Sequence, residues 1–194
     1  MYKENVEVGK KKTNVMLGGN GMHSTIITCS FNVVDGYATF KSATVARPQK
    51  HQAVALRVGA DQSVINRCRI DAYQDTLYAH SLRQFYRDCY ITGTVDFCGA
   101  QNCKLVPRKP MSGQNNMVTA QEELTQTKTH GISIQKCDII ASSDLQPFKG
   151  SFKSYLGRPW KESSRTAVMQ SNNGEYSWVV SVGRGVSIKD FVLR

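Results

Sequence analysis

An internal repeat constrains the fold of this chain more than any other feature. Residues 67–75 (RCRIDAYQD) and residues 88–96 (DCYITGTVD) align at a fixed offset of 21 residues. The aligned pairs are Cys68 with Cys89, Ile70 with Ile91, and Asp75 with Asp96. A period of about 20–30 residues, in segments rich in Val, Ile, Thr and Tyr, is typical of a β-solenoid in which each repeat forms one coil. We therefore expect these pairs to stack on neighbouring coils.

The rest of the chain agrees with an all-β solenoid. Short strand-like runs such as TIITCSF, AVALRVG and GISIQKCDII recur throughout, and turns rich in Gly, Asn, Asp and Ser separate them. No helical periodicity lies between the runs, which excludes a doubly wound sheet, and their irregular spacing fits a solenoid better than a sandwich. We expect one β-helix domain over residues 1–171, followed by a divergent tail over 172–194 that loses the repeat register.

Composition limits the classes of function. The 194 residues are 40% apolar and 21% charged, which is typical of a globular domain. No run approaches the roughly 18 apolar residues of a membrane span, and the first residues lack the apolar core of a signal peptide. The net charge of +10 favours a polyanionic partner, namely nucleic acid, a membrane surface or an acidic polysaccharide. Only GKKK (9–12) is a local basic run, so a nucleic-acid recognition motif is absent and a simple solvated basic surface remains the plain alternative.

The cysteines follow a local pattern. Five of the six are followed, two residues later, by Phe, Ile or Leu, and these five are Cys29, Cys68, Cys89, Cys103 and Cys137. Residues two apart on a strand share a face, so we expect an inward stack of small apolar side chains. No C-x-x-C pair suggests zinc. Cys89 and Cys103 are only 14 residues apart, which requires an abrupt turn, and a disulfide between them stays open.

One set of residues suggests chemistry. Asp75 and Asp96 are predicted to lie on neighbouring coils, about 4.8 Å apart. Two carboxyls at that separation cannot both ionise cheaply, so one pKa is expected to rise and the other to fall, which yields an acid and a nucleophile. Gln74 is adjacent in sequence, and Gln52 lies about one coil earlier. Both can donate hydrogen bonds.

A cation and an aromatic ring complete this set. Arg158 and Trp160 are two apart in YLGRPWKE, so both side chains should point the same way from an extended strand. An arginine can hold one Asp ionised through two hydrogen bonds, and an indole offers a flat apolar face to a sugar ring. Each residue also has a simple structural reading, because Asp and Gln are common in turns and Arg-Pro-Trp can be packing alone. Together they form a hydrolase-like set.

Other catalytic types are disfavoured. The sequence contains no G-x-S-x-G motif, and its four histidines have no metal-ligand spacing. We therefore expect neither a serine esterase nor a metalloenzyme, and no metal or cofactor.

Four segments carry a family resemblance: HQAVALRVGADQ, AYQDTLYAHSLRQFYRDCYITGTVDF, RKPMSGQNNMVTAQ and YLGRPWKESSRT. They closely resemble plant pectin methylesterases (pectinesterases), and the similarity extends from YKENV to about Ser171. The resemblance implies a right-handed, single-stranded parallel β-helix, which we expect to be shortened at both ends. About one coil between ATVA and RPQKHQ, and several residues after GTVDF, are also missing relative to the family pattern.

The resemblance implies hydrolysis of the C6 methyl ester of galacturonate units in pectin. Asp96 would be the nucleophile and Asp75 the general acid and base. Gln74 and Gln52 would donate to the oxyanion, with Gln52 also touching substrate. Thr39, Arg158 and Trp160 would bind substrate, and Cys89 and Cys103 match a family disulfide.

The implied partners and location follow from the same resemblance. The implied partners are methylated homogalacturonan and a proteinaceous pectin methylesterase inhibitor, and the implied location is extracellular, in the cell wall. We expect a monomer that neither spans a membrane nor binds nucleic acid. Two alternatives to the esterase stay open. One is a catalytically impaired β-helix that only binds acidic pectin, because the segment after Asp96 departs from the family pattern. The other is non-specific polyanion binding, which predicts a steep salt dependence.

Overall fold

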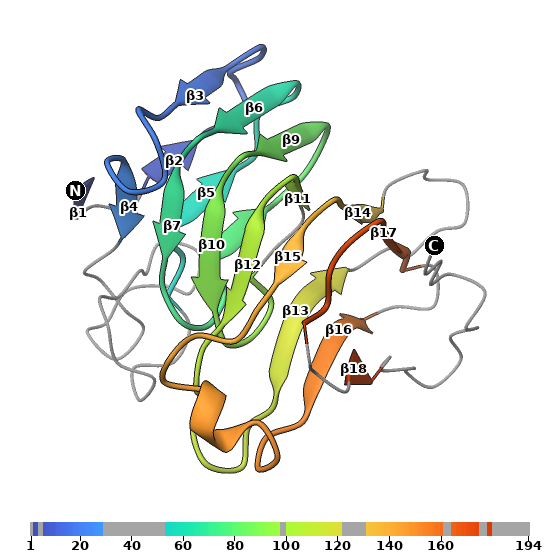
Figure 1. The fold of residues 1–194 in the computed structure, drawn as a ribbon. Helices are drawn as coiled ribbons and strands as arrows, with labels where there is room; N and C mark the ends of the chain where they lie inside the picture. Colours follow the sequence, from blue (N-terminus) through green and yellow to red (C-terminus); the bar gives the residue numbers. More distant parts are fainter. Residues whose placement is uncertain are drawn as a thin grey trace.

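The computed structural model describes residues 2–3, 6–28, 53–97, 100–121, 131–160, 164–174 and 178–179. Short strands and one 3-10 helix make up this part of the chain (Figure 1). The strands are β1 (Tyr2–Lys3), β2 (Val6–Val8), β3 (Met16–Gly18), β4 (Ile26–Thr28), β5 (Leu56–Val58), β6 (Ser63–Asn66), β7 (Arg69–Asp71), β8 (Leu77–Ala79), β9 (Gln84–Arg87), β10 (Tyr90–Gly93), β11 (Ala100–Gln101), β12 (Lys104–Pro107), β13 (Asn116–Gln121), β14 (Ile132–Gln135), β15 (Asp138–Ile139), β16 (Ser154–Pro159), β17 (Thr166–Met169) and β18 (Trp178–Val179). The 3-10 helix, η3, spans Gln146–Phe148.

The strands form parallel sheets in which successive coils are neighbours. One six-stranded sheet has the order β1-β4-β7-β10-β12-β15, and a second has the order β3-β6-β9-β11-β14-β17. The third face holds two three-stranded sheets, β2-β5-β8 and β13-β16-β18. All the described strand pairs are parallel, and most join strands three apart in the chain, such as β7 with β10, so the predicted parallel β-helix is confirmed.

The predicted repeat sets the register. Ile91 pairs with Ile70, and an isolated bridge joins Gln74 to Val95. The next residues along these two segments, Asp75 and Asp96, therefore lie side by side on neighbouring coils. The 21-residue offset predicted this juxtaposition.

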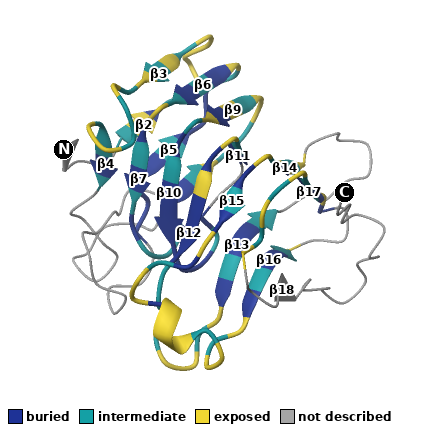
Figure 2. Cartoon of the chain, in the orientation of Figure 1, coloured by how far each residue is buried: buried dark blue, intermediate teal, exposed yellow. Residues whose placement is uncertain are grey.

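Inward side chains form columns along the axis of the helix. Ile27, Ile70, Ile91, Leu105 and Ile139 are consecutive register partners, and none is more than 2% exposed. In Figure 2 dark blue residues lie mainly on the strands, where they alternate with teal ones, and the segment around η3 is largely yellow. Full burial of one such side chain contributes about 2 kcal/mol. The columns therefore hold adjacent coils together.

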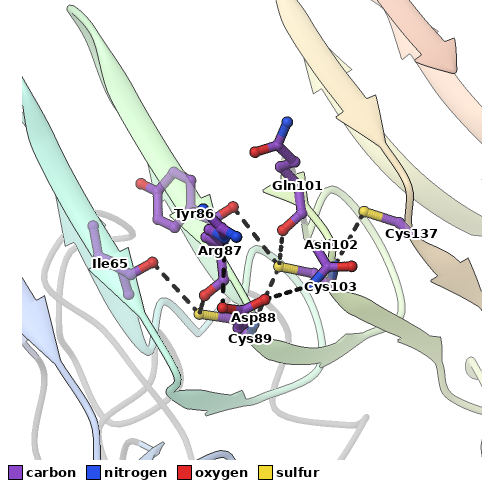
Figure 3. A network of polar contacts seen from close by, with 9 residues as sticks. All are labelled: Ile65, Tyr86, Arg87, Asp88, Cys89, Gln101, Asn102, Cys103 and Cys137. Atoms are coloured by element: carbon purple, nitrogen blue, oxygen red, sulfur yellow. Dashed lines mark hydrogen bonds and ion pairs between the residues drawn. The ribbon is translucent and has the colours of Figure 1, made fainter.

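The cysteines form a second column. Cys68, Cys89, Cys103 and Cys137 are all buried, which confirms the predicted inward stack for these four. Each thiol donates to the carbonyl two residues earlier, as at Cys89 to Arg87 O (3.2 Å) and Cys103 to Gln101 O (3.1 Å). Figure 3 shows this repeated arrangement. Cys29 lies outside the described residues.

The structure does not show the disulfide that the resemblance implied between Cys89 and Cys103. Cys89 and Cys103 are both free thiols. They occupy matching positions on in-register parallel strands, where the spacing between strands is about 4.8 Å and side chains run parallel to each other. A disulfide requires β-carbons about 3.8 Å apart and directed toward each other. The Cys89 backbone N–H instead donates to the Cys103 sulfur at 3.2 Å.

The corner before each cysteine adopts a left-handed conformation. Arg67, Asp88, Asn102 and Lys136 have φ values between 51° and 56°. Such a conformation costs a non-glycine residue about 1 kcal/mol. Backbone hydrogen bonds to the next coil offset this cost, for example Asn102 N to Gln135 O at 2.9 Å and Lys136 N to Met169 O at 3.1 Å.

The third face is interrupted at the coil that contains Asp96. On this face β8 pairs with β5, and β13 pairs with β16, but among the described residues no strand of this face pairs with both β8 and β13. In place of a strand, isolated bridges join Val95 to Gln74 on one side and to Met117 on the other. The short 14-residue spacing from Cys89 to Cys103 explains the break, because one coil of this length cannot supply three strands.

β18 pairs with β16, so the stacking of coils continues beyond residue 171. In the part of the chain that the structure describes, no helix has the length and apolar character required to cross a membrane.

Candidate active site

Asp75 and Asp96 occupy equivalent corners on adjacent coils. Both have left-handed backbones, with φ of 59° and 55°. Asp is one of the residues that tolerate this conformation best. The Asp75 N–H donates to Val95 O and the Asp96 N–H to Met117 O, each at 2.8 Å. Each carboxyl thus extends from a turn that is fixed by hydrogen bonds to the next coil.

Arg158 reaches Asp96 from β16. Its Nε donates to Asp96 Oδ1 at 3.0 Å, and its Nη2 donates to Asp96 Oδ2. The Asp96 side chain is 10% exposed and that of Arg158 is 35% exposed. A two-point contact of this kind fixes the orientation of the carboxylate as well as its charge.

Trp160 lies beside Arg158 on the outer face. The centre of its ring is 5.0 Å from the guanidinium carbon, which confirms that the two side chains point the same way. Its backbone N–H donates to Gln121 O at 3.0 Å, while half of its surface remains open to solvent. An exposed indole next to an ion pair offers an apolar surface to a sugar ring.

The electrostatics of the two carboxyls differ from the prediction. Burial, and then the nearby charge of Asp96, raise the pKa of Asp75 to about 7. Burial also raises the pKa of Asp96, against the opposing hydrogen bond and charge of Arg158. The sequence predicted that one pKa rises and the other falls, but desolvation raises both. Among the described carboxyls Arg158 pairs with Asp96 and not with Asp75, so Asp96 ionises first and Asp75 keeps its proton longer.

Small residues that the sequence reading missed make the turn possible. A β-carbon at Gly93 would lie 2.6 Å from Phe97 Cβ and 2.7 Å from Tyr73 O, so no larger residue fits without movement of the backbone. The Thr76 hydroxyl donates to Thr92 O at 2.9 Å, which ties the two coils together behind the carboxyls. The glycine in ITGTVD was the feature of the sequence that could have predicted this close approach.

Other predicted residues are only partly placed. Gln74 directly precedes Asp75, and its carbonyl accepts a hydrogen bond from Ala53 N at 3.0 Å. Gln52 and Thr39 lie outside the described residues. Among the residues that the structure describes, no cluster of His, Cys, Asp or Glu could hold a metal ion.

This geometry is suited to one type of reaction. A carboxylate held ionised by arginine can act as a nucleophile, and a neighbouring carboxyl with a pKa near 7 can donate and then accept a proton. The two roles are assigned by environment, because the residue type is the same.

Comparisons with known proteins identify similar sequences and a similar fold. The Pectinesterase family model matches residues 1–179. Pectinesterase/pectinesterase inhibitor 18 of Arabidopsis thaliana is 59% identical over 88% of this chain, and Pectinesterase 2.2 of Solanum lycopersicum is 58% identical over 90%. The chain spans only 35% and 36% of these two relatives. The structure of pectin methylesterase from carrot matches the whole chain and 65% of its own length, with a TM-score of 0.79 and 47% identity.

Proposed function

The chain belongs to the pectinesterase family, and on that premise we propose that it hydrolyses the methyl esters of galacturonate units in pectin. The observation that carries this proposal is the arrangement of Asp75 and Asp96 on adjacent coils, with Arg158 bound to Asp96 and not to Asp75. The products would be methanol and a free carboxylate on the polysaccharide.

In the first step the Asp96 carboxylate attacks the ester carbonyl carbon. The tetrahedral oxyanion would be stabilised by amide donors, for which Gln74 and Gln52 are the candidates. The bond from carbon to the methoxy oxygen then breaks, and Asp75 gives its proton to that oxygen. Methanol leaves, and a mixed anhydride joins Asp96 to the substrate.

In the second step Asp75, now ionised, takes a proton from water. The water oxygen forms a bond to the acyl carbon, and the bond to Asp96 breaks. Asp96 returns as a carboxylate, Asp75 is protonated again, and the product acid releases its remaining proton to solvent. One water is consumed for each methanol released.

The test is methanol release from highly methylated pectin by the purified chain and by Asp96→Asn. Asn also tolerates a left-handed turn, so the variant keeps the corner while it removes the nucleophile. We expect release to fall by a factor on the order of 10³ or more.

Asp88→Asn is the matched control. Asp88 occupies a left-handed corner of the same coil (φ 53°), and its described side-chain partners are Asn102 and Arg87. This variant should keep full activity. Equal loss in both variants, or equal retention in both, would contradict the assignment of Asp96 as the nucleophile.

A second candidate function is favoured by the interrupted third face. No described strand joins β8 to β13 beside Asp96, so a chain that binds acidic pectin without cleaving it is the alternative. It predicts pectin binding that involves Trp160, with no methanol release by the folded wild-type chain. Circular dichroism on the same sample shows whether the chain is folded.

Location and further partners are proposed on the same basis. The family resemblance supports action in the plant cell wall on methylated homogalacturonan. Two relatives carry a pectinesterase inhibitor in their names, which supports a proteinaceous inhibitor as a partner of this chain.

A further inference from the structure

Arg108 makes an unusual long-range contact. It directly follows β12, yet its side chain reaches a segment two coils earlier. Its Nη2 donates to the Tyr73 hydroxyl at 2.7 Å, and its Nη1 donates to Ala72 O at 3.4 Å. The guanidinium carbon also lies 3.9 Å from the centre of the Tyr73 ring.

The backbone of Arg108 holds the intervening coil. Its N–H donates to Gly93 O at 2.8 Å. The buried Asn116 amide, oriented with its nitrogen toward two carbonyls, donates to Arg108 O at 3.0 Å and to Thr94 O at 3.1 Å. One residue therefore contacts two coils.

The two held segments lead directly into the two carboxyls. Ala72 and Tyr73 come immediately before Gln74 and Asp75, and Gly93 and Thr94 come shortly before Asp96. The Thr94 N–H donates to Tyr73 O at 2.6 Å, so the segments also touch each other.

The choice of an arginine here is informative. The strand hydrogen bonds already hold the coils, and partial burial of a guanidinium is unfavourable without partners. Among the described residues no carboxylate pairs with Arg108; its described partners are a carbonyl, a phenol and a ring. A planar fork can satisfy these together, and a lysine cannot.

We propose that Arg108 is a positioning residue that sets the separation of Asp75 and Asp96 through Tyr73 and Gly93. The catalytic meaning of this proposal rests on the proposed esterase function. Arg108 would act without touching substrate, by limiting the movement of the two turns. A displacement of about 1 Å between reacting groups can lower a rate by up to about 100-fold.

The principal variant is Arg108→Met, which keeps the length of the side chain and its packing on the ring but cannot donate. Tyr73→Phe is the second variant. It removes only the hydroxyl, so the test remains possible even if Arg108→Met does not fold. Arg87→Met is the control, since Arg87 is 57% exposed and its ion pair with Asp88 is at another corner.

Three measurements are made on each variant. Kinetics on methylated pectin should show kcat reduced roughly tenfold in Arg108→Met, with KM within about twofold. A looser turn admits water to Asp75, so its pKa should fall and the alkaline limb of kcat/KM should move to lower pH. Hydrogen exchange should become faster at the amides of residues 74–76. Arg108→Lys should restore little of the loss, and Tyr73→Phe should show a smaller effect in the same direction.

The outcomes separate this inference from the esterase proposal. If the wild type releases no methanol but exchange at residues 74–76 rises in Arg108→Met, the esterase proposal fails and the positioning role stands. If the wild type is active, and kcat, pH profile and exchange in Arg108→Met all equal those of the Arg87→Met control, the positioning role is overturned. Unchanged exchange together with an inactive wild type also overturns it.

Discussion

At the scale of single residues, each catalytic candidate also has a structural role. Asp75 and Asp96 are turn residues with positive φ, and they are also the two carboxyls of the site. The sequence posed these as alternatives, but they are compatible. A left-handed turn projects its side chain from the corner, and the hydrogen bonds of its backbone to the next coil hold it in place.

Arg158 is predicted to control the ionisation of Asp96. Its contact with Asp96 favours the ionised carboxylate, so Arg158→Met should raise the pKa of Asp96 further. The acidic limb of kcat/KM should then move to higher pH, because the nucleophile must be ionised. The pH profile of methanol release measures this shift.

Arg158→Lys is the informative comparison. It keeps the positive charge but loses the two-point contact. Compared with Arg158→Met, the acidic limb of kcat/KM should therefore lie closer to its wild-type pH, while kcat should recover to a smaller extent. An acidic limb that stays in place in Arg158→Met would show that Arg158 does not control the ionisation of Asp96.

At the scale of elements, the register of parallel strands decides what the cysteines do. Four of them stack at equivalent positions on consecutive coils, and the thiols donate to carbonyls instead of joining to each other. The same register that builds the buried column thus disfavours disulfide geometry within it.

This arrangement predicts how the thiols react. Under native conditions without reductant, iodoacetamide should leave the peptides carrying Cys89 and Cys103 unmodified, because both residues are buried. In denaturant, still without reductant, both should be alkylated in full. Mass spectrometry distinguishes the states, and a peptide that joins Cys89 to Cys103 would contradict the prediction.

At the scale of the whole molecule, the site makes the stability of the fold dependent on pH. The pKa of Asp75 is about 7 in the folded chain, against an ordinary value of 3.8. Between these pH values the folded state binds the proton that the unfolded state has lost, so stability declines as pH rises from about 4 to 7. The full difference corresponds to up to ~4 kcal/mol at higher pH.

Replacement of this carboxyl should remove that dependence. Asp75→Asn should have a higher Tm than the wild type at pH 8, with little difference at pH 4, and Asn can keep the left-handed turn. Thermal denaturation followed by circular dichroism at both pH values measures the effect. Asp88→Asn serves as the control and should follow the wild type; a parallel pH dependence in Asp75→Asn and wild type would show that Asp75 is not the group responsible.

The sequence alone determined the architecture and predicted the principal candidate residues of the site. A β-helix is a nearly one-dimensional fold, in which each coil contacts its neighbours, so a repeat of 21 residues specifies both the stacking and the partner of each residue. For this reason the pairing of Asp75 with Asp96 was predictable from the sequence, while the buried cysteine column was predictable from the apolar residue two positions after each cysteine. Arg158 and Trp160 were found through their shared strand face.

Only the tertiary structure decided the remaining features, which depend on desolvation and on contacts outside the repeat. Burial raises the pKa of both carboxyls, and the extent of burial is a property of the packed molecule that residue types do not encode. The free state of Cys89 and Cys103 follows from the direction of side chains on in-register strands. The contact of Arg108 with Tyr73 crosses two coils at a corner, where the 21-residue period gives no information.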